Sequence, residues 1–144
     1  MADVIFMDLG FPVTLVDPPM IEVWGQMVPD IDMGWIQDSA VRLLLVKAAR
    51  LTGSQVGFIR SYFRLRQVDL ARVLNMANHS VVSQWESRHD EPSGMDYNTE
   101  VLLRLWMATR LGRQDSLAEL LETGLKNMSQ RADGPLRIEF GRAP

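Results

Sequence analysis

The stretch from residue 65 to residue 87, LRQVDLARVLNMANHSVVSQWES, contains the pattern that decides the fold. Apolar residues recur every three or four positions on both sides of residues 75–78, a spacing typical of amphipathic helices. Asparagine, at positions 75 and 78, favours turns and helix N-caps. The stretch therefore predicts a short helix over residues 67–74, a turn over residues 75–78, and a second short helix over residues 79–87, capped by Asn78.

The second of these helices has two chemically different faces. Val82 and Trp85 are three residues apart, so they share one face and can pack into a core. The other face carries small polar side chains, with one apolar side chain beside them: His79, Ser80, Val81, Ser83 and Gln84. Uncharged donors and acceptors of this kind suit the reading of base edges in the major groove of DNA. For His79 alone, a solvated loop or capping role is the simpler alternative.

Charge is distributed very unevenly along the chain. The total is −3, but the first 41 residues contain seven acidic residues and no Lys or Arg. Residues 42–88 contain eight basic and two acidic residues, a net charge of +6. A run of arginines at positions 60, 64, 66 and 72 flanks the two short helices, where phosphate contact is the functional interpretation and a solvated face the alternative. The middle of the chain is therefore basic, and the first 41 residues form an acidic head.

Strands are expected in the acidic head and helices in the rest of the chain. Apolar runs over residues 4–6, 13–16 and 20–24, separated by Gly and Pro, predict a ribbon of two or three strands. A late strand over residues 136–140 could pair with this ribbon. Helical spacing begins near residue 33, with Asp32 as N-cap, and again after Thr52, which forms a capping box with Gln55. Two further helices are expected over residues 97–111 and 116–128, the latter with Ser116 and Glu119 at capping-box spacing.

These elements predict a mainly α protein: a helix-turn-helix domain of five to six helices with a small N-terminal β ribbon. Four segments are expected. Residues 1–32 form the acidic β-rich segment, and residues 33–51 form a connecting helix. Residues 52–128 form the helix-turn-helix domain with its C-terminal helices, and residues 129–144 form a tail.

Residues 52–87 resemble the Cro and phage-repressor type of helix-turn-helix, often called Xre-like. The resemblance rests on Arg60, on Leu65-Arg66-Gln67-Val68-Asp69-Leu70-Ala71 and on Val82-Ser83-Gln84-Trp85-Glu86. The flanking Leu51-Thr52-Gly53, Phe58-Ile59-Arg60, Asn98-Thr99-Glu100 and Leu103-Arg104-Leu105 are similar, more narrowly, to the MqsA-like antitoxin and regulator branch. The resemblance implies that Gln67 contacts phosphate, that residues 79–84 lie on a recognition helix, and that Arg60 pairs with Glu86 as a structural ion pair.

The sequence departs from that family at two places. The turn over residues 75–78 stands where the family usually has a turn that contains Gly and is one residue shorter. The zinc-binding N-terminal domain of the antitoxin branch is absent, because the chain has no cysteine. Together, the residues and the resemblance give the predicted DNA-binding set: Arg66, Gln67, Asn78, His79, Ser80, Val81, Ser83, Gln84 and Arg88.

Other chemistries find little support in the composition. Zero cysteines remove disulfides, thiol catalysis and Cys-ligated metals, and two histidines leave little for a metal site, so no cofactor is expected. His89-Asp90-Glu91 fits a solvated loop better than a proton-transfer site, and residues 53–57 fit close helix packing because a phosphate loop needs a Lys and a preceding strand. Without a nucleophile beside a base, the chain is not expected to be an enzyme. It contains no apolar run of membrane-spanning length and no basic signal region, so a cytoplasmic protein is expected.

Two functional hypotheses remain. The first is a sequence-specific transcriptional regulator, a repressor that binds a palindromic operator in double-stranded DNA as a homodimer. The alternative is the antitoxin of a type II toxin-antitoxin system, which neutralises a toxin by protein contact and autoregulates its operon. The acidic head discriminates between them: a basic partner that co-purifies with residues 1–50 would support the antitoxin, and a homodimer that binds no partner would count against it.

Overall fold

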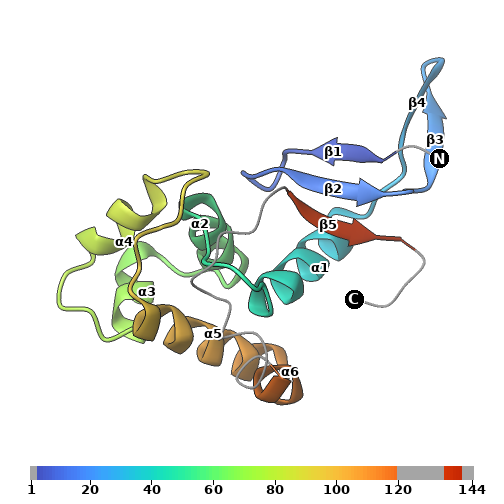
Figure 1. Ribbon diagram of the computed structural model, residues 1–144. Helices are drawn as coiled ribbons and strands as arrows, with labels where there is room; N and C mark the ends of the chain where they lie inside the picture. Colours follow the sequence, from blue (N-terminus) through green and yellow to red (C-terminus); the bar gives the residue numbers. More distant parts are fainter. Residues whose placement is uncertain (1–2, 120–134, 141–144) are drawn as a thin grey trace. The chain divides into compact units, whose positions relative to one another are not determined.

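The computed structural model describes residues 3–119 and 135–140, which fall into two compact units. Unit 1 comprises Met1–Leu43 and Gly134–Pro144, and unit 2 comprises Leu44–Asp133. The described chain is mainly helical with small N-terminal sheets (Figure 1), as predicted. The C-terminal strand, which falls in the expected tail, belongs to unit 1.

Unit 1 is built on a three-stranded sheet. Strand β2 (Val13–Val16) lies in the middle, antiparallel to β1 (Val4–Phe6) and parallel to β5 (Leu136–Glu139). Three consecutive residues of β2, from Val13 to Leu15, are buried, as expected for a strand that is covered on both faces. The predicted pairing of the late strand with the N-terminal strands is confirmed.

A second, separate sheet is a hairpin of β3 (Met20–Val23) and β4 (Gln26–Pro29). The prediction of a single N-terminal ribbon of two or three strands was wrong, since β1 to β4 are divided between two sheets. Trp24 and Gly25 form a two-residue turn with φ of +54° and +77°, and the chain returns as β4. Positive φ at both central positions matches the twist of a hairpin, but Trp is an unusual first residue there, so the local signal was weak.

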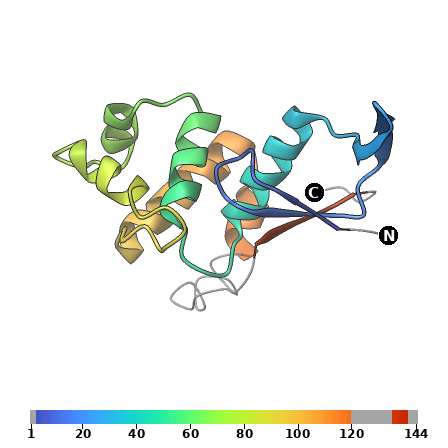
Figure 2. The ribbon, with the colours of Figure 1, turned by 90° about the horizontal axis from the view of Figure 1, so that it is seen from above.

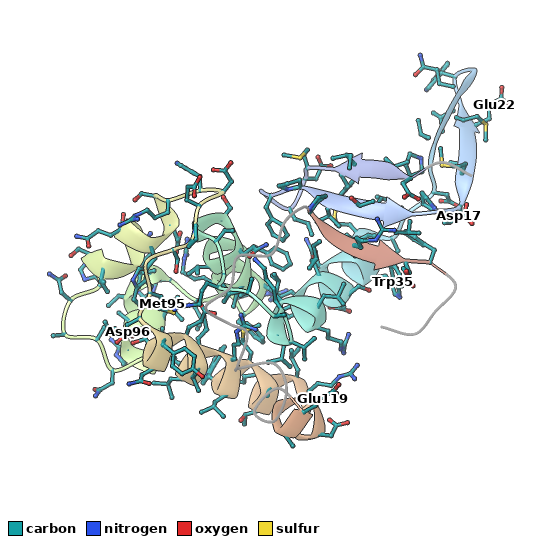
Figure 3. The ribbon with its side chains drawn as sticks, in the orientation of Figure 1. Asp17, Glu22, Trp35, Met95, Asp96 and Glu119 are labelled. Atoms are coloured by element: carbon teal, nitrogen blue, oxygen red, sulfur yellow. The ribbon has the colours of Figure 1, made fainter. Side chains whose placement is uncertain are left out.

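Helix α1 (Met33–Leu45) follows the hairpin. Asp32 caps it as predicted, because its Oδ1 accepts a hydrogen bond from the Gly34 amide at 2.9 Å. Its apolar face buries Ile36, Ala40 and Val41. Trp35 contacts Phe140 at the end of β5, with ring centroids 5.0 Å apart (Figure 3).

Unit 2 contains the remaining helices: α2 (Gly53–Tyr62), α3 (Gln67–Val73), α4 (Ser80–Glu86), α5 (Tyr97–Leu111) and α6 (Gln114–Glu119). The capping box of Thr52 and Gln55 is confirmed, with reciprocal hydrogen bonds of 3.0 and 3.2 Å. The prediction that Ser116 begins the last helix was wrong, since α6 begins at Gln114. Gly112, with φ of +65°, ends α5 and lets the chain turn directly into α6. The expected continuation to residue 128 lies outside the described residues.

The prediction that the connecting helix continues to residue 51 was wrong, since α1 ends at Leu45. The cause is the side chain of Arg104 on α5, which is fully buried. It donates hydrogen bonds to the backbone carbonyls of Leu45, Lys47 and Ala49 at 3.2, 2.6 and 2.8 Å. Carbonyls at the end of a helix lack intrahelical partners, and here one guanidinium group satisfies three carbonyls of an irregular connection.

Glu100 completes this buried polar network. Its side chain is fully buried, and its Oε2 accepts from Arg104 at 2.9 Å. Its Oε1 accepts from the Leu51 amide and from Arg50 Nε, both at 3.2 Å. Arg50 also donates to the carbonyl of Met95, which lies just before α5 (Figure 3). The network joins residues 45–51 to the first turns of α5.

Lys47, at the edge of this network, makes the free energy of unfolding depend on pH in the alkaline range. Burial and the nearby Arg104 guanidinium lower its pKa from 10.5 to about 8. Between pH 8 and 10.5 the unfolded chain therefore binds more protons than the folded chain, so stability rises with pH in that window. We expect a rise of roughly 1–2 kcal/mol, less than the full shift implies because the side chain is partly exposed.

Urea unfolding at pH 7.5, 9 and 10 tests this expectation, with Lys47→Met as the comparison. The variant should lack the rise, since Met does not titrate. Parallel pH profiles for the two proteins would show that Lys47 is an ordinary solvated lysine.

Candidate nucleic-acid interface

The packing of α4 against α2 is fixed by an ion pair between Arg60 and Glu86. Arg60 Nε and Nη2 donate to the two carboxylate oxygens of Glu86 at 2.7 and 3.0 Å, and Nη1 donates to the Leu65 carbonyl at 3.0 Å. The hydrogen bond to Glu86 raises the pKa of Arg60. The predicted structural pair is confirmed, and with three hydrogen bonds within the protein Arg60 serves as a structural residue.

Gly53 allows the start of α2 to touch the end of α4. A Cβ atom at this position would lie 2.8 Å from the His89 nitrogen, 3.0 Å from the Glu86 carbonyl oxygen, and closer still to the carbonyl oxygen of Trp85. The predicted close helix packing is therefore confirmed. The amides of Gly53 and Ser54 also donate to the carbonyls of Glu91 and His89 at 3.1 and 2.8 Å, so the loop after α4 is tied to α2.

Gly53→Ala should destabilise the protein by about 2 kcal/mol or more, because the obstructing atoms belong to the backbone and cannot move aside. Gly57→Ala is a matched control on the same helix. Its Cβ would meet only the Glu86 side chain, at an ordinary contact distance of 3.4 Å, and alanine is the better helix former by up to about 1 kcal/mol. Urea unfolding of both variants tests this difference, and equal stabilities would contradict the close approach.

Arg66 and Gln67 stand at the start of α3, as predicted. Arg66 is the N-cap residue, and its guanidinium group forms two hydrogen bonds with the Asp69 carboxylate, at 3.0 and 3.1 Å. The Arg66 amide donates to the same carboxylate at 2.9 Å. These hydrogen bonds lower the pKa of Asp69 to about 2. Arg72 also approaches Asp69, at 3.7 Å, so one acid holds two exposed arginines on α3.

Asp69 was missed as a candidate residue when only the sequence was considered. The signal was present, since Arg66 and Asp69 are three residues apart at a helix start, where an acid at the third position caps the backbone. The pair also orients the arginine, which makes Asp69 a positioning residue.

Two non-glycine residues adopt left-handed backbone conformations at helix ends. Arg64 follows α2 with φ of +58°, and Asn75 follows α3 with φ of +56°. At each site the next amide donates back into the helix: Leu65 to the Arg60 carbonyl at 3.0 Å, and Met76 to the Ala71 carbonyl at 2.8 Å. This arrangement usually uses Gly and sometimes Asn, so Asn75 is a favourable residue at its position.

Helix α4 begins at Ser80, one residue later than predicted. The N-cap position is His79, whose side chain makes no capping hydrogen bond. The Asn78 side chain before it accepts from the Ser80 amide at 3.0 Å, so it satisfies an amide at the start of the helix. Val82 and Trp85 are buried as predicted, with exposed fractions of 0% and 5%. The helix lies at the outer edge of unit 2 in both views (Figures 1 and 2).

The predicted DNA-binding residues lie at the start of α3, just before α4, along α4 and, for Arg88, just after α4. The exposed ones are Arg66, Asn78, His79, Ser80, Ser83, Gln84 and Arg88, and the half-buried ones are Gln67 and Val81. The exposed side chains of α4, Ser80, Ser83 and Gln84, are polar and carry no charge. Exposed arginines at positions 64, 66, 72 and 88 supply positive charge outside this helix.

A hollow beside α3 is open to solvent. Its lining comes from α3 and the following turn: Val68, Ala71, Arg72, Asn75, Met76, Ala77 and His79. The loop after α4 exposes His89, Asp90 and Glu91, in keeping with the solvated loop expected there.

Fold and site together define a mainly helical protein with small N-terminal sheets and a helix, α4, whose exposed side chains are polar and uncharged. Comparisons with protein-family models, with curated proteins and with solved structures found no match. Among residues 3–119 and 135–140, no three His, Cys, Asp or Glu side chains are grouped so as to hold a metal ion. No helix in the same ranges is long and apolar enough to cross a membrane.

Proposed function

We propose that this chain is a sequence-specific DNA-binding transcriptional regulator, a cytoplasmic repressor in which α3 and α4 form a helix-turn-helix. The observation that carries the proposal is the asymmetry of α4. Val82 and Trp85 are buried, while Ser80, Ser83 and Gln84 are exposed and bring only neutral hydrogen-bonding groups to the surface. A helix of this kind suits the major groove, where amides and hydroxyls pair with base edges.

The exposed arginines supply the complementary contacts. Phosphate contacts give affinity and fix the orientation of the protein on the duplex, whereas base contacts give specificity. Arg66 is held in place by Asp69 and stands beside Gln67 at the start of α3. We assign phosphate contact to Arg66, Gln67 and the neighbouring arginines, and base contact to the exposed face of α4.

The proposal includes a homodimer on a palindromic operator. A helix of seven residues reaches few base pairs, so a single copy would discriminate poorly among genomic sites. Two copies with α4 in successive major grooves would contact half-sites about 34–36 Å apart.

Selection from a pool of random duplexes tests the proposal. The full chain is incubated with the pool at fixed salt concentration, and bound duplexes are recovered and sequenced over several rounds. We expect an enriched motif with two inverted half-sites, centred about 10–10.5 base pairs apart. A folded chain that enriches no motif would refute sequence-specific recognition, even if it retained weak, salt-sensitive binding to all duplexes.

A further inference from the structure

Lysine is rare in this chain, and one of its two lysines lies at the edge of the buried polar network. Of the 15 basic residues, only Lys47 and Lys126 are lysines, and the other 13 are arginines. Among residues 3–119 and 135–140, Lys47 is the only lysine. Arginine keeps its proton under all ordinary conditions, whereas the amine of lysine can lose its proton and become a nucleophile. Lys47 therefore brings to the network a chemistry that its arginines lack.

Two hydrogen-bond acceptors hold the Lys47 amine. Nζ donates to Gln55 Oε1 at 2.8 Å and to the Arg50 carbonyl at 3.0 Å, and it makes no other hydrogen bond within the described part of the chain. An ammonium group has three N–H donors, while a neutral amine has two donors and a lone pair. The two acceptors therefore satisfy a neutral amine completely and leave its lone pair free to attack an electrophile.

The charges around Lys47 favour the neutral amine. Arg104 is fully buried and donates to the Lys47 carbonyl at 2.6 Å. The Glu100 carboxylate opposes this effect, but it is shared between Arg50 and Arg104, at 3.2 and 2.9 Å. Burial and the Arg104 charge prevail and lower the pKa of Lys47 to about 8. At pH 7.5 about a quarter of this amine is neutral, compared with roughly 0.1% of an ordinary lysine.

We propose that Lys47 is a site of covalent acylation by small acyl phosphates. The lone pair of Nζ attacks the acyl carbon, an N–C bond forms, and the C–O bond to phosphate breaks. The phosphate leaves with the bonding electron pair and takes up the proton that the nitrogen loses. The products are an amide and inorganic phosphate, so the step needs no oxidant, reductant or further reactant. This inference does not depend on the proposed function.

The charge and burial of this segment favour an acyl phosphate over other acyl donors. Residues 39–68 contain six Lys or Arg residues and no Asp or Glu. A phosphate group carries about two negative charges at neutral pH, and a positive segment raises the local concentration of such an anion. Lys47 is half-buried, so a small reagent reaches its amine more readily than a donor attached to a large carrier.

Acylation changes the connection between residues 47–50 and α2. The amide product has a single N–H, so either Gln55 Oε1 or the Arg50 carbonyl loses its donor. Gln55 Oε1 also accepts from the Thr52 amide at 3.0 Å, as part of the capping box. The modification therefore acts at the start of α2, the helix that Arg60 joins to α4.

Mass spectrometry of the full chain after reaction with acetyl phosphate at pH 7.5 tests the proposal. The acetylation rate of Lys47 is measured in the folded protein and in 6 M guanidinium chloride, each time relative to an added peptide with one exposed lysine. We expect this relative rate to be about tenfold higher in the folded protein, since the gain in neutral amine exceeds the losses from burial and lower basicity. The rate at Lys47 should level off above about pH 8, while the rate of the peptide continues to rise.

Val46→Lys provides a matched control, because it adds an amine one position away. Val46 is 39% exposed, so the added amine meets the same segment charge without the two acceptors of Lys47, and it should react like the peptide. Raising NaCl from 50 to 500 mM should reduce the advantage of Lys47, since salt screens the attraction of an anionic reagent.

Each contrary result overturns the proposal. Equal relative rates in the folded and unfolded chain would show that the fold does not activate Lys47. Equal rates at Lys47 and at the amine added by Val46→Lys would show that the acceptors and the network contribute nothing. An advantage that salt leaves unchanged, or that a neutral acetyl ester reproduces in full, would refute selection of an acyl phosphate.

Discussion

Replacing Arg104 with Met should destabilise the protein by about 3–5 kcal/mol, a large part of the stability of a domain of this size. The substitution removes the donor for the carbonyls of Leu45, Lys47 and Ala49. It also leaves the fully buried Glu100 carboxylate with Arg50 as its only ion-pair partner among the described residues. Buried polar groups that lose their partners cost far more than the net value of the original hydrogen bonds.

Arg110→Met on the same helix is the matched control. Arg110 is exposed and lies over the Trp106 ring at 5.1 Å, an arrangement worth about 0.5–1 kcal/mol at the surface. Urea unfolding with an unchanged m value would attribute the difference to the native state. If Arg104→Met cost no more than Arg110→Met, the buried network would contribute nothing to stability.

The double variant Ser83→Ala, Gln84→Ala should lower affinity for the selected operator about 100-fold while leaving binding to random duplex unchanged. Both side chains are exposed on α4, so their removal should not unfold the helix. Each base contact contributes about 1–3 kcal/mol of discrimination. The expected loss is therefore confined to specific binding, measured as the ratio of operator to random-duplex dissociation constants at one salt concentration.

Arg66→Gln should lower affinity for the operator and for random duplexes by the same factor. Loss of one phosphate contact weakens binding to all duplexes alike and reduces the slope of log affinity against log salt by about 1. Asn98→Ala, which removes an exposed amide from the first turn of α5, serves as a control for both variants. If the α4 variant lost operator and random binding equally, α4 would not be the helix that reads bases.

Much of the candidate interface could be predicted from the sequence because it depends on short-range rules. The faces of α4 follow from the three-residue spacing of Val82 and Trp85. The Asn78 hydrogen bond at the start of α4 and the Thr52 capping box follow from residue type at fixed offsets. Arg60 and Glu86 are 26 positions apart, so no short-range rule predicts their ion pair. It was expected only from the family resemblance.

The elements that were not predicted depend on contacts between distant residues. Arg104 sits on an ordinary amphipathic helix, and only the folded chain brings it to the carbonyls of residues 45–49, where it ends α1 early. Strand β4 was missed because the turn before it has Trp24 at its first position, where local preferences favour Asn or Gly. The start of α6 was misplaced because Gly112 turns the chain directly into that helix.

By itself, the sequence determined the mainly helical class, the helix boundaries near their caps, the polar face of α4 and the separation of charge along the chain. These properties follow from periodicity and residue type within a few positions. Only the tertiary structure decided where α1 ends, that the first strands form two sheets, which of these strands β5 joins, and that Trp24 stands fully exposed at a hairpin turn. Burial and long-range hydrogen bonding are set by residues far apart in the chain, and no local pattern specifies which of them will meet.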